Sequence, residues 1–88
     1  LIGTGYIGKA HAIAYAQAPT VFDLQGKLVC EMVAEVTPEL AAKRAAAFRF
    51  KRSTGDWREL VADPNIDVVD ICSPNHLHKE MALEAIRH

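Results

Sequence analysis

Apolar residues follow two spacings along this chain, and the two spacings alternate. Continuous apolar runs of strand length occupy 28–36 and 66–72, whereas the stretches after them place apolar residues three or four positions apart. Continuous runs favour buried strands, and the wider spacing favours helices with one packed face. The order is therefore β-α-β-α-β-α-β-α, with predicted strands at 1–2, 28–36, 48–53 and 66–72 and predicted helices at 7–18, 38–47, 57–62 and 76–87.

Local signals mark the ends of these helices. Thr37 is predicted to cap the second helix with Pro38 at its first position, and Asp56 is predicted to cap the third. Pro19 is predicted to end the first helix. The apolar side of that first helix is predicted to consist of Ala10, Ile13, Ala14 and Ala18.

Alternation of strands and helices is typical of an α/β fold with a doubly wound parallel sheet, covered by helices on both faces. Right-handed crossovers give the strand order 3-2-1-4, with the switch point between strands 1 and 4. A ligand crevice is expected there, at the carboxyl ends of the strands. The chain starts two residues before its first turn, so we expect most of strand 1 to lie outside it.

The first turn carries the sequence G-T-G-Y-I-G. Gly3 is expected to allow a tight turn, Gly5 to let a pyrophosphate approach the backbone, and Gly8 to let the helix pack closely. Free N–H groups near Tyr6 and Ile7 would favour a phosphate at the helix start. Together with the sheet, the turn predicts a partial Rossmann fold, although a glycine turn that binds nothing stays open.

An acidic residue ends the second predicted strand. Glu35 lies where a carboxylate accepts hydrogen bonds from the adenosine ribose and repels a 2′-phosphate, although an unpartnered surface acid is the alternative. Arg52, on the neighbouring third strand, could come near the same ribose and hold a 2′-phosphate. We favour NAD over NADP as the cofactor.

Polar residues follow the fourth predicted strand. Ser73 and Asn75, on either side of Pro74, are expected to be free to form hydrogen bonds in the crevice, or to cap the last helix. His78, on the first turn of that helix, could reach the nicotinamide half of a dinucleotide. His11 is interpreted as a packed or half-exposed helix residue rather than a catalytic one.

Length, charge and cysteine content limit the classes of partner and ligand that the chain is expected to bind. The chain has 88 residues, enough for one domain, and its net charge is −1 with basic residues scattered, so nothing indicates nucleic-acid binding. No apolar run approaches the roughly 20 residues that span a membrane. Cys30 and Cys72 lie in strands separated by another strand, roughly 10 Å apart, so we expect no disulfide and a reducing cytoplasm. Two cysteines alone do not close a metal site, and no metal is expected.

Four motifs, in order and at consistent spacing, resemble the N-terminal domain of the Gfo/Idh/MocA oxidoreductases, which include glucose–fructose oxidoreductase and inositol 2-dehydrogenase. They are G-T-G-Y-I-G-K-A-H, A-E-V-T-P-E, D-W-R-E-L-V-A-D-P-N-I-D-V-V-D-I-C and S-P-N-H-L-H, which together span nearly the whole chain. The resemblance implies a diphosphate on the backbone of Gly5, Tyr6 and Ile7, and an adenosine ribose on Glu35 in place of the family's frequent aspartate. It also implies that the ribose and nicotinamide side is lined by Ser73, Pro74, Asn75 and His78.

The same resemblance implies that part of the machinery lies outside this chain. The family's catalytic lysine belongs to a Glu-Lys-Pro motif expected shortly after His88, and a substrate-binding domain follows it. Residues 1–88 are therefore expected to be an N-terminal dinucleotide-binding domain, incomplete at both ends and inactive alone, with Lys9 and Lys79 at ordinary exposed helix positions. The whole protein is expected to be a homo-oligomer that takes a sugar, polyol or inositol.

Two other classes of function stay open at this stage. A dinucleotide-binding domain kept for sensing, without turnover, would show the same residues and would differ by the missing lysine. A methyltransferase that uses S-adenosylmethionine is a weaker alternative, because it has no pyrophosphate to bind and commonly shows a looser glycine turn.

Overall fold

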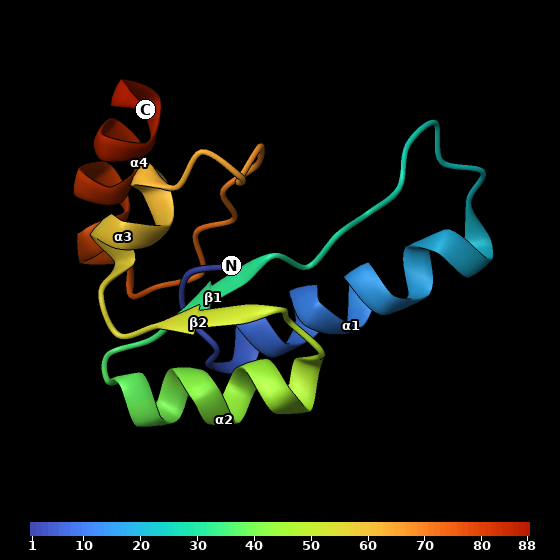
Figure 1. The fold of residues 1–88 in the computed structure, drawn as a ribbon, viewed down its shortest axis with the longest axis horizontal. Coiled ribbons are helices and arrows are strands. Elements are labelled where there is room, and N and C mark those ends of the chain that lie inside the picture. Colours follow the sequence, from blue (N-terminus) through green and yellow to red (C-terminus); the bar gives the residue numbers. More distant parts are fainter.

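The computed structural model describes residues 1–88 as an α/β fold with a small parallel sheet (Figure 1). Figure 1 shows α1 and α2 on one side of the two strands, and α3 and α4 on the other. None of the helices has the length and apolar character needed to cross a membrane. In chain order, the elements are α1 (Tyr6–Val21), β1 (Met32–Ala34), α2 (Pro38–Phe48), β2 (Arg52–Thr54), α3 (Trp57–Ala62), a 3₁₀ turn (Asn75–Leu77) and α4 (His78–Arg87).

The extended segments run parallel to one another. β1 pairs with β2 so that Met32 faces Arg52 and Ala34 faces Thr54. On the other side of β1, Ile2 forms isolated parallel bridges with both Ala34 and Ile71. The backbone of Ile2 donates to Asp70 O at 2.9 Å and accepts from Cys72 N at 2.8 Å. Ile2 therefore connects the strand pair to the segment at 70–72.

The ordered strands are shorter than the apolar runs predicted. Of the run 28–36 only Met32–Ala34 forms a strand, and of the run 66–72 only Ile71 forms a bridge. A strand pairs only where another extended segment lies alongside it, and Leu1 and Ile2 are the residues that lie between these two runs. The third strand begins at Arg52 rather than at 48, because α2 continues to Phe48 and Arg49 then ends it with φ +61°.

The predicted caps of α2 and α3 are confirmed. The Thr37 side chain accepts a hydrogen bond from Leu40 N at 3.1 Å, and the Asp56 side chain accepts one from Arg58 N at 3.0 Å. The predicted end of α1 at Pro19 is wrong, because the helix continues to Val21. Pro19 is exposed in the last turn of the helix, where a proline removes a single backbone donor.

The packed face of α1 also differs from the alanine-rich side that the sequence favours. Ile13 is 64% exposed, and Gly8 is the one buried residue of the helix. Ala12 packs against the cluster of Leu1, Val33 and Ala45, and Tyr15 meets Phe50 edge to face. A larger cluster fills the opposite face of the sheet; it consists of Ile2, Met32, Ala34, Leu60, Val61 and Met81.

Candidate functional site

A cleft of about 750 Å³ lies at the carboxyl ends of the extended segments. That volume falls within the range of small-molecule sites, about 300–1,000 Å³. Parallel sheets bind ligands at this edge, where strand order reverses. The walls of the cleft come from the glycine turn (residues 3–7), the end of β1 (34–36), the start of α3 (55–58), the stretch 72–74, and Leu77 and Met81.

The three glycines of the turn have different surroundings. Gly3 has φ +89°, and a Cβ there would lie 2.8 Å from the carbonyl carbon and oxygen of Cys72. A Cβ on Gly8 would collide with the carbonyl oxygen of Gly3, so this glycine lets α1 sit directly on the turn. Gly5 faces open space, with nothing within 4 Å of its Cβ position. Two glycines therefore shape the turn, and the third leaves its backbone accessible.

The start of α1 faces the cleft without a side-chain cap. Gly5 is the N-cap residue, and neither a capping side chain nor an acidic residue accepts from the first turn. The first amides of a helix have no partner within the helix and carry partial positive charge. Tyr6 and Ile7, both exposed, lie beside these amides in the cleft wall. The helix start therefore offers free donors to an anion.

Glu35 lies in the cleft wall at the end of β1, as predicted, but it has partners. Its Oε1 accepts hydrogen bonds from the backbone N–H of Thr4 at 2.6 Å and from the Thr4 hydroxyl. Its Oε2 accepts one from Val36 N at 3.0 Å. A carboxylate oxygen has two lone pairs, so Oε2 can still accept from a ligand hydroxyl. The carboxylate thus joins the glycine turn to β1 and retains acceptor capacity.

Arg52 does not line the cleft. Its Nε donates to Glu31 at 2.8 Å and its Nη1 to Asp63 at 2.7 Å. Hydrogen bonds to these two carboxylates raise the pKa of the Arg52 guanidinium, and the Arg52 partner lowers the pKa of Asp63 below its usual range. The structure therefore does not bring this arginine to a ribose 2′-position.

Ser73 and Pro74 line the cleft, but the Ser73 hydroxyl is not free as expected. Ser73 is buried, and its Oγ donates to Met81 Sδ at 3.1 Å. Its carbonyl oxygen accepts from His78 Nε2 at 2.6 Å, so the imidazole points at the backbone of this stretch. Neither Ser73 nor Asn75 caps α4, because Leu77 is its N-cap residue and Pro74 is that of the preceding 3₁₀ turn; no side-chain hydrogen bond caps either element.

Asn75 and His78 lie outside the lining of the cleft, whereas several residues that the sequence did not assign to the site lie within it, among them Thr4, Trp57, Arg58 and Leu77. Thr4 holds Glu35. Trp57 and Arg58 form one wall, with the guanidinium 4.4 Å from the indole ring centroid and 2.6 Å from Glu80. The D-W dipeptide after β2 was the available signal for this wall.

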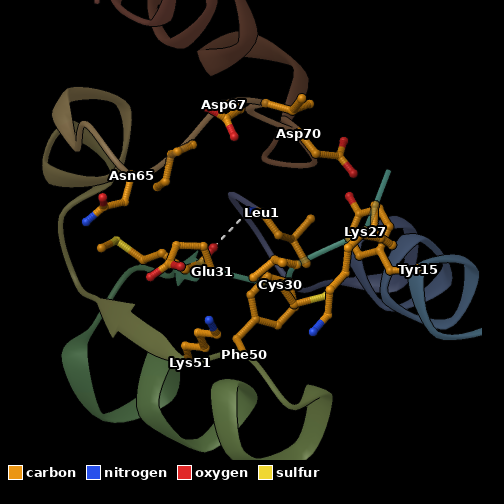
Figure 2. A pocket seen from close by; sticks show the side chains of 15 residues that line it. Leu1, Tyr15, Lys27, Cys30, Glu31, Phe50, Lys51, Asn65, Asp67 and Asp70 are labelled. Carbon is orange, nitrogen blue, oxygen red and sulfur yellow. Dashed lines mark hydrogen bonds between the residues drawn. The ribbon is translucent and has the colours of Figure 1, made fainter. Parts of the chain in front are cut away.

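A second cavity, of about 460 Å³, lies at the amino ends of the segments (Figure 2). Figure 2 shows apolar and acidic side chains around it, among them Leu1, Phe50, Glu31 and Asp67. It has neither a glycine turn nor a free helix start, and it lies at the edge of the sheet opposite the cleft. It is therefore not a candidate for the nucleotide.

The glycine turn, the uncapped helix start and the acid that ends β1 define a nucleotide-binding domain of the α/β class. The chain belongs to the oxidoreductase family with an NAD-binding Rossmann fold (GFO_IDH_MocA), whose sequence model it matches over residues 1–88. The resemblance drawn from the motifs is thereby confirmed, and the methyltransferase alternative is excluded.

Alignments with individual relatives include nearly all of this chain but only a small part of each relative. Levoglucosan dehydrogenase of Pseudarthrobacter phenanthrenivorans is 52% identical over 86 residues, which are 97% of this chain and 22% of that protein. The NADP(+) scyllo-inositol 2-dehydrogenase IolU of Bacillus subtilis is 36% identical over 88 residues, 100% of this chain and 25% of that protein. A solved structure of levoglucosan dehydrogenase with NADH and levoglucosan has a TM-score of 0.91 at 50% identity, over 98% of this chain and 24% of that one. The chain thus spans about a quarter of the length of these relatives.

Proposed function

We propose that this chain is the NAD-binding part of an oxidoreductase that transfers a hydride between a nicotinamide cofactor and a carbinol carbon of a sugar, polyol or inositol. The observation that carries the proposal is the convergence, in one cleft, of the accessible backbone of Gly5, the uncapped start of α1 and the carboxylate of Glu35. These three features match an anion flanked by a hydroxylated sugar.

The residues of the cleft fit a dinucleotide on physical grounds. The diphosphate would lie against the amides of Gly5, Tyr6 and Ile7, because no side chain occupies those donors. Gly3 and Gly8 hold the turn in place, since a Cβ on either would strike backbone. When bound, the nicotinamide supplies the site at which a hydride is donated or accepted.

Glu35 supports NAD rather than NADP. Its Oε2 would accept from the adenosine ribose, and its charge would oppose a 2′-phosphate. Arg52 offers no compensation, because both of its ion pairs lie outside the cleft. Arg58 is a basic residue in the wall, and its guanidinium is paired with Glu80. The inositol relative, named for NADP(+), makes the choice of cofactor worth measuring in this protein.

The stretch after Ile71 would form the nicotinamide side of the site. Ser73 and Pro74 line the cleft and would contact the ligand directly. His78 would act through Ser73, because its Nε2 donates to that residue's carbonyl. Asn75 is exposed beside the cleft and would reach the ligand only by turning toward it.

The remaining parts of the proposal concern the whole protein. We propose the strand order 3-2-1-4, which the bridges of Ile2 to Ala34 and Ile71 support. Residues 1–88 would be the N-terminal domain, and the proton-transferring lysine and the substrate domain would lie beyond His88. Lys9 and Lys79 are exposed and outside the cleft lining, so neither takes that role. A homo-oligomeric state and a cytoplasmic location stay predictions.

The test is a coupled measurement on the complete protein. NADH binding is followed by fluorescence, and NAD reduction is followed by absorbance with levoglucosan, inositols and aldoses as substrates. Tight NADH binding with turnover of at least one of these carbinols is the expected result. NADH binding without turnover of any of them would favour the alternative, a non-catalytic dinucleotide-sensing module. Failure to bind NADH would overturn both.

A further inference from the structure

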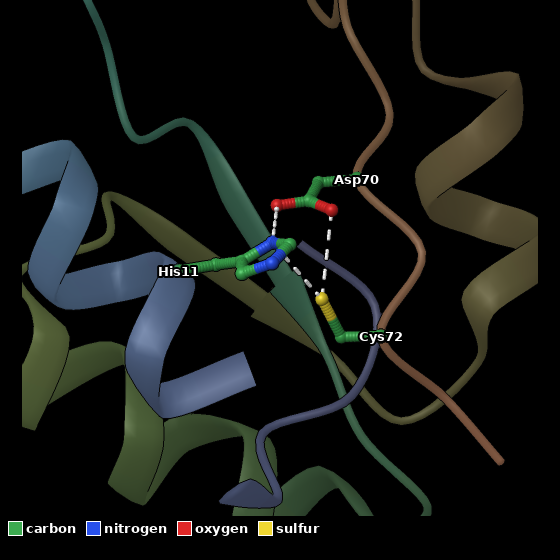
Figure 3. A group of neighbouring side chains, drawn as sticks. All are labelled: His11, Asp70 and Cys72. Atoms are coloured by element: carbon green, nitrogen blue, oxygen red, sulfur yellow. Dashed lines mark hydrogen bonds and ion pairs between the residues drawn. The ribbon is translucent and has the colours of Figure 1, made fainter. Parts of the chain in front are cut away.

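Three side chains with metal-binding atoms meet on the flank of the glycine turn. His11 comes from α1, and Asp70 and Cys72 come from the segment that bridges to Ile2 (Figure 3). The His11 Nδ1 lies 2.7 Å from Asp70 Oδ2 and 3.3 Å from Cys72 Sγ, and this sulfur lies 3.5 Å from Asp70 Oδ1. His11 and Asp70 lie outside the lining of the proposed cofactor cleft, and Cys72 lies in its wall.

The arrangement is not that of a nucleophilic triad. In such a triad the carboxylate holds one ring nitrogen and the thiol meets the other, so that a proton can pass through the ring. Here both the carboxylate and the sulfur approach the same nitrogen, Nδ1, as Figure 3 shows. Burial, reinforced by Asp70, raises the pKa of the Cys72 thiol to about 11, which is opposite to the activation a nucleophile needs.

The separations fit a different geometry, that of atoms around one cation. Bonds of about 2.0 Å to nitrogen and oxygen and about 2.3 Å to sulfur place tetrahedral ligand atoms roughly 3.3–3.6 Å apart. The two sulfur distances, 3.3 Å to His11 Nδ1 and 3.5 Å to Asp70 Oδ1, lie close to this range. The oxygen that contacts Nδ1 is the other one, Oδ2, so the carboxylate must turn to offer a single oxygen to the cation. The Nδ1–Oδ2 pair, at 2.7 Å, must open by roughly half an ångström. His11 is half-exposed on a helix surface, so its ring has room for this movement.

The geometry points to a binding site for one thiophilic divalent cation of the zinc class, formed by His11 Nδ1, a carboxylate oxygen of Asp70 and Cys72 Sγ. A thiolate, an imidazole and a carboxylate are a ligand set that zinc accepts, with a water molecule at the fourth position. The side chains of His11 and Asp70 are 45% and 26% exposed, which leaves the cation a path from solvent.

Cation binding exchanges protons for metal bonds. Without a cation, the thiol donates to Asp70 Oδ1 and the carboxylate pairs with the imidazole at Oδ2. With it, the sulfur loses its proton to solvent and the neutral imidazole carries its proton on Nε2. One proton is therefore released for each cation bound.

The site would also tie two parts of the proposed cofactor cleft together. His11 lies on the helix whose start faces the cleft, and the backbone of Cys72 lies 2.8 Å from the position that a Cβ on Gly3 would take. A cation held by both elements therefore fixes α1 against the segment 70–72. The proposal itself depends only on the three side chains, so it can hold whether or not the cofactor assignment does.

Cobalt titration of the complete protein tests the site, because thiolate-bound Co²⁺ shows a sulfur-to-metal charge-transfer band in the near ultraviolet. We expect one Co²⁺ per chain to give this band, Zn²⁺ to abolish it by displacement, and Cys72→Ser to remove it. Cys30→Ser, which changes the chain's other cysteine outside the cluster, should leave the band unchanged. Far-UV circular dichroism confirms that each variant is folded.

Two further variants keep the test decisive if Cys72→Ser does not fold. Asp70→Asn and His11→Gln keep a polar side chain of similar size but remove a good ligand, and each should weaken Co²⁺ binding at least tenfold. The proposal is overturned if the wild-type protein shows no thiolate band at millimolar Co²⁺. It is equally overturned if the band survives in folded Cys72→Ser, or if both Asp70→Asn and His11→Gln bind as the wild type does.

Discussion

Replacing Gly3 by alanine tests how strictly the backbone shapes the nucleotide turn. The added Cβ would lie 2.8 Å from the carbonyl carbon and oxygen of Cys72 and 2.9 Å from Ser73 N. Because these neighbours are backbone atoms, the overpacking should cost about 1–3 kcal/mol. The positive φ of +89° adds about 1–2 kcal/mol for an L-residue. Reduced freedom of the unfolded chain offsets about 0.4–1 kcal/mol, which leaves a net destabilisation of roughly 1–5 kcal/mol.

The assay is thermal unfolding of the cofactor-free complete protein by far-UV circular dichroism, beside NADH titration by fluorescence. Gly3→Ala should lower the unfolding temperature by several degrees. Gly5→Ala is the matched control, because its Cβ meets nothing within 4 Å. It should unfold near the wild-type temperature yet bind NADH at least tenfold more weakly, about 1.4 kcal/mol. Wild-type stability of Gly3→Ala, or wild-type NADH affinity of Gly5→Ala, would refute this account of the turn.

Three other experiments test two carboxylates and one thiol: Glu35, Asp63 and Cys72. Glu35→Gln keeps the acceptor for Thr4 but removes the charge, so NADH affinity should fall about tenfold and NADPH affinity less; equal losses in fluorescence titrations would contradict the role of the carboxylate. Arg52 lowers the pKa of Asp63 below 3.8, so this pair stabilises the fold above about pH 4 and loses that contribution as pH falls through the lowered value. In Asp63→Asn, the free energy of unfolding should not fall in this pH range as it does in the wild type. The same pH dependence of unfolding in both proteins would contradict the role of the pair. With its pKa raised from 9.0 to about 11, Cys72 should react with iodoacetamide at pH 8 about a hundredfold more slowly than an ordinary thiol, and fast labelling traced to this residue by mass spectrometry would show the thiol to be accessible and ionised.

Local signals accounted for much of the fold. Thr37 and Asp56 cap α2 and α3 as predicted, because a cap is a contact between residues two or three positions apart. The helix α3 has the predicted bounds, and Leu60 and Val61 are buried. The predicted end of α1 at Pro19 was wrong, because the free-energy cost of a proline in a helix depends on the surroundings of that turn. The sequence of the segment does not contain this information.

Some features of the candidate site are likewise set by local sequence, and others only by tertiary packing. The amino-acid sequence by itself determined the glycine turn, the acid at the end of β1 and the alternation that puts both at one edge of a parallel sheet, because glycine conformation and apolar periodicity are properties of short segments. Only the tertiary structure decided that Glu35 is held by Thr4, that Arg52 is paired away from the cleft, and that the Ser73 hydroxyl faces Met81. It alone brought His11 to Asp70 and Cys72, across about sixty residues of chain. Such partners are chosen by the packing of segments far apart in sequence, and no pattern within one segment encodes them.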